Sequence, residues 1–385
     1  MKKVCLISTV TDTSGAFLVP MSEYLQNHTD WELSLICSLN HPEYLELIPE
    51  GVRFIPIPMK RGISLWGISA CMKMFRVFRK EKFDMIQYCT PNASLYASLA
   101  GWLAGVKVRL YCQWGMIFVS FPKGLKRWVF KTMEKTICAL STHVQPDSFG
   151  NLELCHRLKL YPKEKGSVVW NGSTCGIDLD RFDISQKPRW RREVRQELEL
   201  PQDATVLGFV GRVTRDKGIN ELFEAFRQLE KKHPKLYLML VGPLEEGGHV
   251  DPQLYHWAQE HPRVRLCGQC SGVERYLSAM DCYVLPSYRE GFGTSIIEAE
   301  AMELPIVATN IPGPTEAMRE NVTGILVTPR DTEALLAGIE QMLSDPEAML
   351  RFGKAARAYV AERFEISRFF EEMLKDRKQL LENKP

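Results

Sequence analysis

Residues 286–302 read Pro-Ser-Tyr-Arg-Glu-Gly-Phe-Gly-Thr-Ser-Ile-Ile-Glu-Ala-Glu-Ala-Met, and the fold can be worked out from this stretch. The β-branched, apolar run just before it, 283–285, predicts a buried strand that the proline ends. The apolar residues of 296–302 predict a helix that begins at about Thr294, with Thr294 or Ser295 as its N-cap. A strand, a glycine-containing loop and a helix N-terminus together form a common anion-binding site, because free N–H groups and the helix dipole converge there.

Two carboxylates, Glu290 and Glu298, flank this predicted anion site. A carboxylate repels a phosphate, so we expect both side chains to face hydroxyl groups instead. A ligand with a phosphate part and a polyol part, such as a nucleotide sugar, suits this arrangement. The alternative interpretation is a capped helix with a solvated acid at each end, and this stretch alone supports both readings.

The same alternation of short apolar runs and amphipathic segments continues along the whole chain. It predicts an α/β fold built from βαβ units on parallel sheets, and the length of 385 residues favours two domains. The expected strands are 4–9, 32–37, 52–57, 85–88, 108–112, 142–145 and 167–169 in the first half, and 205–210, 236–241, 264–266, 283–285, 305–308 and 324–327 in the second. We therefore expect two similar open α/β domains.

Four segments follow from this pattern. We expect a first Rossmann-like domain at 1–165, a linker rich in Asn, Gly and Asp at 166–200, and a second Rossmann-like domain at 201–360. The remainder, 361–385, is expected to be a helical crossover segment. Its amphipathic helix, near 366–381, is long enough to reach back across the first domain.

Composition and charge exclude several classes of protein. The net charge of +2 gives no overall attraction to nucleic acid, and no nucleic-acid-binding module is present. Eleven cysteines lack a paired pattern; the C-x-x-C at Cys267 and Cys270 has no partner pair, so reduced thiols are expected rather than a zinc site. The D-x-D at Asp178 and Asp180 has no neighbouring ligands. We therefore expect no metal and no cofactor.

The N-terminus and the apolar runs favour a cytoplasmic protein. The apolar run after Lys3 has about seven residues, so it predicts a strand rather than a signal peptide. The apolar run at 93–106 is too short to span a bilayer.

A second informative stretch lies at 208–218, Gly-Phe-Val-Gly-Arg-Val-Thr-Arg-Asp-Lys-Gly. A strand ends at Gly211, and Arg212 and Lys217 follow in a loop before a helix expected near Asn220. Two cations beside a glycine-punctuated strand end suit a pyrophosphate, because Arg can bind two oxygens at once and Lys acts as a point charge. These cations would neutralise the leaving-group charge without a metal. The alternative is ordinary solvated surface charge.

Together these motifs resemble the retaining glycosyltransferases of family 4, which have the GT-B fold. The resemblance rests on Gly211-Arg212, Lys217-Gly218, the Val-Gly-Pro at 241–243, the loop at 286–293 and the Glu-x7-Glu pair. It covers essentially the whole chain. It implies two Rossmann-like domains with the active site in the cleft, and a C-terminal helix that crosses back to the first domain.

The resemblance also implies roles for the charged residues. Glu290 would bind hydroxyls of the donor sugar, and Glu298 would bind the ribose hydroxyls. Arg212 and Lys217 would hold the diphosphate and stabilise it as it departs. With Glu290, these two cations are the catalytic candidates.

Further contacts of the donor would come mainly from the backbone. The residues implied on this side are Gly211, Gly268, Gly291, Phe292, Gly293 and Thr294, with Gly268 in the loop that would lie against the base. On the acceptor side, Gly15 in the first strand–helix turn would let a loop approach the transferred sugar. This turn, 11–15, is not a G-x-G-x-x-G motif, so a dinucleotide site is not expected.

The sequence departs from the family pattern at two positions. Relatives commonly carry a His-Gly after the strand that matches 110–113, whereas this chain has Trp114-Gly115. Trp donates one N–H and stacks on a sugar face, but it does not exchange a proton near pH 7. The first turn offers Ser14-Gly15 rather than two glycines. Both departures bear on the donor sugar more than on the class of reaction.

These observations predict a metal-independent hexosyltransferase or N-acetylhexosaminyltransferase that moves a sugar, with UDP as the expected carrier, to a lipid-linked or growing surface glycan. The alternatives are a non-catalytic nucleotide-sugar-binding protein, and a sugar-nucleotide hydrolase or epimerase on the same fold. The segment 117–131 interleaves aromatic and basic residues, and 73–82 holds a second basic cluster. This composition predicts peripheral binding to anionic lipid at the inner face of the membrane; its alternative is a solvated helix face.

Overall fold

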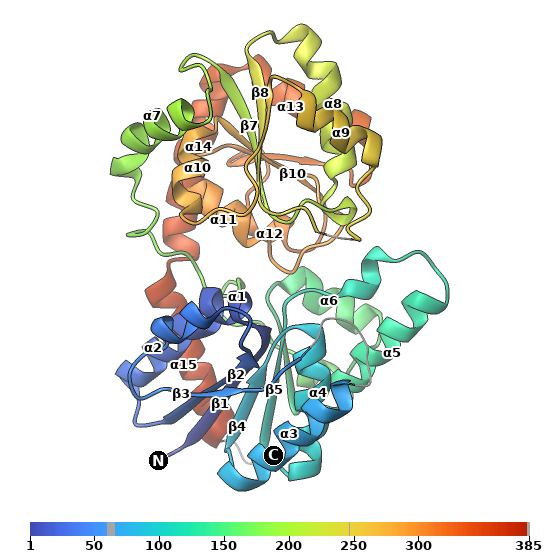
Figure 1. Ribbon diagram of the computed structural model, residues 1–385, viewed down its shortest axis with the longest axis vertical. Helices are drawn as coiled ribbons and strands as arrows, with labels where there is room; N and C mark the ends of the chain where they lie inside the picture. The colour runs from blue at the N-terminus through green and yellow to red at the C-terminus, as the bar shows by residue number, and fades with distance from the viewer. Residues whose placement is uncertain (60–65, 246, 383–385) are drawn as a thin grey trace. The chain divides into compact units, whose positions relative to one another are not determined.

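The computed structural model describes residues 1–59, 66–245 and 247–382, and it divides into two compact units (Figure 1). Unit 1 consists of Met1–Cys175 together with the C-terminal segment from Ser367 onward, and unit 2 is Gly176–Ile366. The residues expected to form the linker thus divide between them. Each unit contains one parallel six-stranded sheet, which confirms the predicted α/β class and the two Rossmann-like domains.

In unit 1 the strand order is β3-β2-β1-β4-β5-β6. The strands are β1 (Lys3–Val10), β2 (Glu32–Ser38), β3 (Arg53–Pro56), β4 (Met85–Tyr88), β5 (Val108–Gln113) and β6 (His143–Pro146). The helices are α1 (Thr11–Thr13), η1 (Ser14–Leu18), α2 (Val19–His28), η2 (Pro42–Leu47), α3 (Trp66–Glu81), α4 (Pro91–Ala104), η3 (Ile117–Ser120), α5 (Leu125–Leu140), α6 (Phe149–Arg157), η4 (Lys163–Lys165) and, after unit 2, α15 (Ile366–Glu382). The central strands are buried on both faces, as the near-continuous apolar runs require.

The C-terminal helix α15 belongs to unit 1, as predicted. Its apolar face is buried, and the ring centre of Phe370 lies 5.2 Å from that of Tyr24 on α2. Figure 1 shows α15, in red, beside α2. Arg377, which is 2 % exposed, donates to Gln87 at 2.9 Å and to Gln145 at 2.6 Å. A buried charge is tolerated only when it is well paired, so these contacts fix the rotation of the helix on the sheet.

In unit 2 the strand order is β12-β11-β10-β7-β8-β9. The strands are β7 (Thr205–Val210), β8 (Leu236–Val241), β9 (Val264–Leu266), β10 (Cys282–Leu285), β11 (Ile306–Thr309) and β12 (Gly324–Val327). The helices are η5 (Ile184–Gln186), α7 (Lys187–Glu197), η6 (Arg215–Lys217), α8 (Ile219–Lys232), α9 (Pro252–Glu260), α10 (Val273–Ala279), α11 (Thr294–Ala301), α12 (Pro314–Ala317), α13 (Thr332–Ser344) and α14 (Pro346–Arg363).

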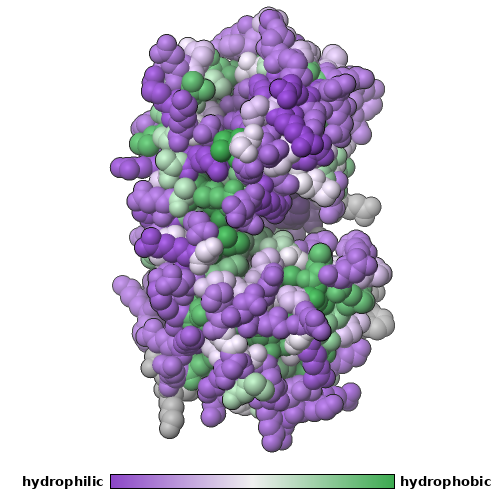
Figure 2. Space-filling view, turned by 90° about the vertical axis from the view of Figure 1, so that its left-hand side faces the viewer, coloured by the Kyte–Doolittle hydropathy of each residue, from purple (hydrophilic) through white to green (hydrophobic). Residues whose placement is uncertain are grey.

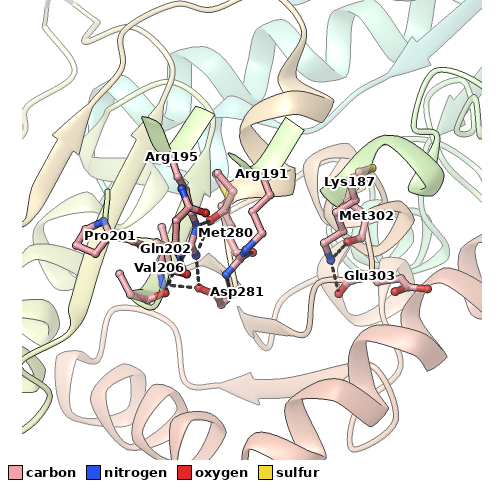
Figure 3. Close-up of polar contacts among 12 residues, drawn as sticks. Lys187, Arg191, Arg195, Pro201, Gln202, Val206, Met280, Asp281, Met302 and Glu303 are labelled. Atoms are coloured by element: carbon pink, nitrogen blue, oxygen red, sulfur yellow. Dashed lines mark hydrogen bonds and ion pairs between the residues drawn. The ribbon is translucent and has the colours of Figure 1, made fainter. Parts of the chain in front are cut away.

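Helix α7 is anchored to the rest of unit 2 by one buried and two partly buried cations, which Figure 3 shows pointing at their partners. Arg195 is fully buried; it donates to the carbonyl of Ala279 and pairs with Asp281 at 2.8 Å. Arg191 pairs with the same carboxylate at 2.7 Å. Lys187 donates to the carbonyl of Met302 at 2.5 Å, and burial lowers its pKa to about 8. The helix before β7 is therefore an integral part of unit 2.

Two predictions about the local structure of unit 1 are wrong. Residues 167–169 form no strand: the pairing here is an isolated bridge between Gly166 and Val144, with one hydrogen bond from the Ser167 N–H to the Val144 carbonyl at 3.1 Å. The turn expected at 11–15 is helical: α1 starts at Thr11 and continues through a π-helical segment into α2. The chain therefore enters its first helix directly from β1.

Hydrophilic residues predominate on the face of the molecule in Figure 2, with hydrophobic residues in smaller groups between them. Within the described ranges, we find no helix of the length and apolarity needed to cross a membrane.

Candidate active site

The candidate site lies at the carboxyl edge of the unit 2 sheet. Strands β7 and β10 are adjacent and parallel, with Leu207 opposite Cys282, so the loops that follow them emerge at the same edge. The first loop, 211–218, leads into α8, and the second, 286–293, leads into α11. Open α/β sheets bind ligands at this edge.

The two loops touch each other directly. A Cβ on Gly218 would lie 2.1 Å from the carbonyl oxygen of Pro286, and Gly218 has a φ of +73°. Only glycine combines that backbone conformation with such a close approach. The motif Lys217-Gly218 is thus explained by packing between loops as well as by charge.

The close approach brings Lys217 and Glu290 together. The Lys217 ammonium donates to Glu290 Oε1 at 2.5 Å, and the hydroxyl of Ser287 donates to the same oxygen at 2.7 Å. The side chains of Lys217 and Glu290 are 18 % and 12 % exposed. Two residues that are 73 positions apart, both catalytic candidates from the sequence, therefore form one partly buried ion pair.

Arg212, the other predicted phosphate ligand, makes a separate ion pair. Its guanidinium contacts the carboxylate of Glu245 in the loop after β8, and its side chain is 44 % exposed. Gly211, just before it, donates its N–H to the carbonyl of Val241 at 2.9 Å, which continues the β7–β8 pairing. No motif in the sequence predicts Glu245 as the partner of Arg212.

The N-terminus of α11 has a different cap from the predicted one. The N-cap is Gly293, with a φ of +95° and no side-chain hydrogen bond, and Thr294 is already the first helical residue. The prediction of Thr294 or Ser295 as the cap is therefore wrong. The first-turn N–H groups of a helix have no partner within the helix, so this terminus presents an end with partial positive charge, and its N-cap residue has no side chain to cap it.

Phe292 and Gly268 can contribute only through their backbone. The Phe292 side chain is 1 % exposed and packs edge-on against Phe364, with ring centroids 5.1 Å apart. Gly268 follows β9 and accepts a hydrogen bond from the N–H of Gly242 at 2.7 Å. Gly268 thus lies at the same sheet edge as Gly291 and its neighbours in the second loop.

Glu298 lies on α11, and its environment differs from that of Glu290. Burial raises the pKa of Glu298 to about 7; the charge of Arg181 opposes the rise, and that of Glu274 adds to it. Arg181 itself pairs with Glu274 at 3.1 Å. In the part of the chain that the structure describes, no side chain donates a hydrogen bond to the Glu298 carboxylate. Sequence reasoning did not identify Arg181 or Glu274 as neighbours of this site.

The acceptor-side candidates lie in unit 1. Gly15 is in the π-helical segment η1, and a Cβ there would lie 3.6 Å from Leu47, an ordinary contact. Trp114 follows β5, and its ring meets Phe17 edge-on at 5.1 Å. Trp114 also lines a small cavity with Gln145, Thr174 and other residues of unit 1.

Comparisons with known proteins agree with this architecture. The model for "Glycosyl transferases group 1" matches residues 191–359, and the model for "Glycosyl transferase 4-like" matches residues 3–148. The capsular polysaccharide biosynthesis glycosyltransferase CapM of Staphylococcus aureus is 30% identical over 318 residues, which are 82% of either chain. A UDP-Gal:alpha-D-GlcNAc-diphosphoundecaprenol alpha-1,3-galactosyltransferase of Escherichia coli is 24% identical over 353 residues, 89% of this chain and 88% of its own.

A solved structure shares the fold. Anabaena HepE, determined with UDP and glucose, superposes with a TM-score of 0.79 at 19% identity, covering 98% of this chain and all of its own. The chain therefore belongs to the group 1 glycosyltransferases of family 4 and has the GT-B fold.

Proposed function

We propose that the protein transfers a sugar, with retention of configuration, from a UDP-sugar to a lipid-linked or growing surface glycan. The observation that carries this proposal is the Lys217–Glu290 pair in the loops that lead into α8 and α11, together with the N-terminus of α11, whose N-cap residue is a glycine. A cation and a helix dipole together favour a departing diphosphate. The Glu290 carboxylate, which is hydrogen-bonded to Lys217, would accept hydrogen bonds from sugar hydroxyls.

The relatives support the donor and the acceptor class. The E. coli relative is named for a UDP-galactose donor and a diphosphoundecaprenol-linked acceptor, and CapM for capsular polysaccharide biosynthesis. HepE has been crystallised with UDP-glucose. We extend UDP as carrier and a lipid-diphosphate-linked glycan as acceptor to this chain.

The proposed reaction needs no protein nucleophile. The bond between the sugar C1 and the diphosphate oxygen breaks, and the acceptor hydroxyl attacks C1 on the same face. The departing phosphate oxygen takes the hydroxyl proton. Lys217 and Arg212 stabilise the developing negative charge, and Glu290, already bonded to Lys217 and Ser287, orients the sugar rather than attacking it.

Glu298 would bind the ribose hydroxyls, as the family resemblance implies. A carboxylate accepts two hydroxyl donors best when it is ionised. Because burial raises the pKa of Glu298 to about 7, ionisation of Glu298 should favour ribose binding, and ribose binding should favour the ionised form. Trp114, in place of the usual His, would stack on a sugar without exchanging a proton.

A membrane-facing role for α5 in unit 1 is the second part of the proposal. Leu125 and Trp128 are 76% and 64% exposed, and the Lys126 ammonium lies 4.3 Å from the ring centre of Phe121. Exposed aromatic and aliphatic groups among cations suit an anionic lipid surface. Helices α3 and α5 both pack against α4. Helix α3 carries the second set of cations, and Trp102 on α4 is exposed.

Replacement of Lys217 by Met or of Glu290 by Gln should lower the rate of UDP release from the donor by about 10²–10³-fold. The first change removes a positive charge that would stabilise the departing diphosphate, and the second removes a carboxylate that would orient the donor sugar. The measurement is UDP release from a panel of UDP-sugars with a lipid-diphosphate acceptor. Lys235→Met serves as a control, since Lys235 is 71% exposed and pairs with exposed Asp203.

Different outcomes separate the alternatives. Binding of a UDP-sugar without any turnover would support a non-catalytic binding protein. Equal turnover with and without acceptor would support a hydrolase or an epimerase. Neither binding nor turnover with any nucleotide sugar would contradict the proposal.

Binding of UDP-glucose should depend on pH through Glu298. The ionised fraction of Glu298 rises through a pKa of about 7, so wild-type affinity should be about tenfold higher at pH 8.5 than at pH 6.0. The Glu298→Gln variant should bind more weakly and with little pH dependence. Calorimetric titration at both pH values measures this, and the same pH dependence in both proteins would exclude Glu298 as its cause.

Flotation with vesicles that contain anionic lipid should weaken when four cations of 123–131 are replaced by Gln. The positions are Lys123, Lys126, Arg127 and Lys131. The expected loss is about 1 kcal/mol of binding free energy per cation near the surface. A matched control replaces four exposed lysines of unit 2, namely Lys231, Lys232, Lys235 and Lys354. Equal flotation of the two variants would contradict a specific role of α5.

A further inference from the structure

We propose that Asp216 and Arg289 are positioning residues that clamp together the two loops of the site, so that Lys217 and Glu290 keep their alignment. This inference rests on the proposed function. Asp216 directly precedes Lys217 in the first loop, and Arg289 directly precedes Glu290 in the second. Each clamp residue thus fixes the backbone beside one catalytic candidate.

The clamp is an ion pair between the loops. Arg289 Nη2 lies 2.9 Å from Asp216 Oδ2, and the two side chains are 20 % and 24 % exposed. The other carboxylate oxygen, Oδ1, accepts from the hydroxyl of buried Thr214 at 2.6 Å. Both oxygens of Asp216 are therefore held, which leaves its side chain little freedom to rotate.

The backbone continues the connection. The N–H of Tyr288 donates to the carbonyl oxygen of Asp216 at 2.8 Å. The Tyr288 hydroxyl donates to Glu221 on α8 at 2.5 Å, and the guanidinium of Arg330 lies 4.6 Å from the centre of its ring. The backbone of Gly218 also packs against the carbonyl group of Pro286. The first loop therefore contacts the second at three successive residues, Asp216, Lys217 and Gly218.

The charges at this junction favour an ionised Asp216. Burial acts to raise its pKa, but the charges of Arg289, Lys217 and Arg212 and the hydrogen bond from Thr214 together hold the pKa below its usual value. The ion pair thus persists through the neutral pH range in which the Lys217–Glu290 pair must act.

Replacement of Arg289 should affect the activity of the enzyme more than the stability of its fold. Arg289 Nε is buried and has no hydrogen-bond acceptor among the described residues, and an unsatisfied buried donor opposes stability. Replacement of Arg289 by Met leaves the Asp216 carboxylate without its ion pair, which lowers stability, but it also removes the unsatisfied donor, so the net loss of stability should be smaller than for a fully satisfied pair. An effect on activity should remain, because a shift of about 1 Å in a catalytic group can cost about 10²-fold in rate.

The test compares Asp216→Asn, Arg289→Met, Arg289→Lys and the double variant Asp216→Asn/Arg289→Met. We expect each of the first two to lower kcat/KM for the UDP-sugar by about 10- to 100-fold and to raise the dissociation constant of UDP. The double variant should lose no more than the worse single one, because the pair acts as a unit. Arg289→Lys restores a point charge opposite Asp216 and should recover part of the loss.

A matched control is Arg263→Met, which breaks the pair between Arg263 and Glu230. That pair is 2.7 Å long and similarly buried, at 24 % and 13 % exposure. Arg263 directly precedes β9, so it lies at the amino edge of the sheet, opposite the site. This variant should lower the melting temperature and leave kcat/KM within about twofold of wild type.

Three results would overturn the clamp. One is wild-type kinetics and UDP affinity in Asp216→Asn and Arg289→Met. Another is a loss of kcat/KM that is proportional to the decrease in melting temperature across the variants, with Arg289→Lys as inactive as Arg289→Met. The third is a wild-type protein that neither binds UDP nor turns over any UDP-sugar; this result overturns the proposed function as well, whereas the first two leave it intact.

Discussion

The close approach of the β7–α8 and β10–α11 loops is the constraint on which the candidate site depends. Gly218 lies so near the carbonyl oxygen of Pro286 that no Cβ fits between them. This contact brings Lys217 within hydrogen-bonding distance of Glu290. Since β7 and β10 are neighbours in a parallel sheet, the fold itself places both loops at one edge, and the glycine lets them meet.

The cations of the candidate site are paired with carboxylates. Lys217 is paired with Glu290, and Arg212 with Glu245. An unpaired charge in a partly buried site is costly, so each carboxylate stabilises its cation. In the proposed reaction, a diphosphate would compete with both carboxylates for these cations, and Glu290 would then be available to sugar hydroxyls. The Lys217–Glu290 pair, which joins the two loops, thus consists of two groups that the proposed reaction uses.

All expected strands but one are present, because strands follow from local patterns. Apolar runs such as 205–210 and 236–241 identify buried strands, and the carboxyl edge of a parallel sheet is where binding loops are expected, so the place of the candidate site could be proposed from the sequence. The failed strand at 167–169 shows the limit of this approach: a strand needs a partner along its whole length, and here the pairing with β6 stops after Gly166 and Ser167. At α11, the sequence offered Thr294 and Ser295 as plausible caps, but Gly293 takes the left-handed conformation first. The pairs Arg181–Glu274 and Asp216–Arg289 join residues far apart in the chain, so no local pattern could reveal them.

The most direct test of the central claim is hydrogen–deuterium exchange of the full chain with and without UDP. If the two loops of unit 2 form the nucleotide site, UDP should slow exchange in 211–218 and 286–298, where the glycines and the start of α11 provide the backbone N–H groups. Little change should occur at the amino edge of the same sheet, around Arg263. Protection confined to other segments, with both loops exchanging as in the free protein, would contradict the account.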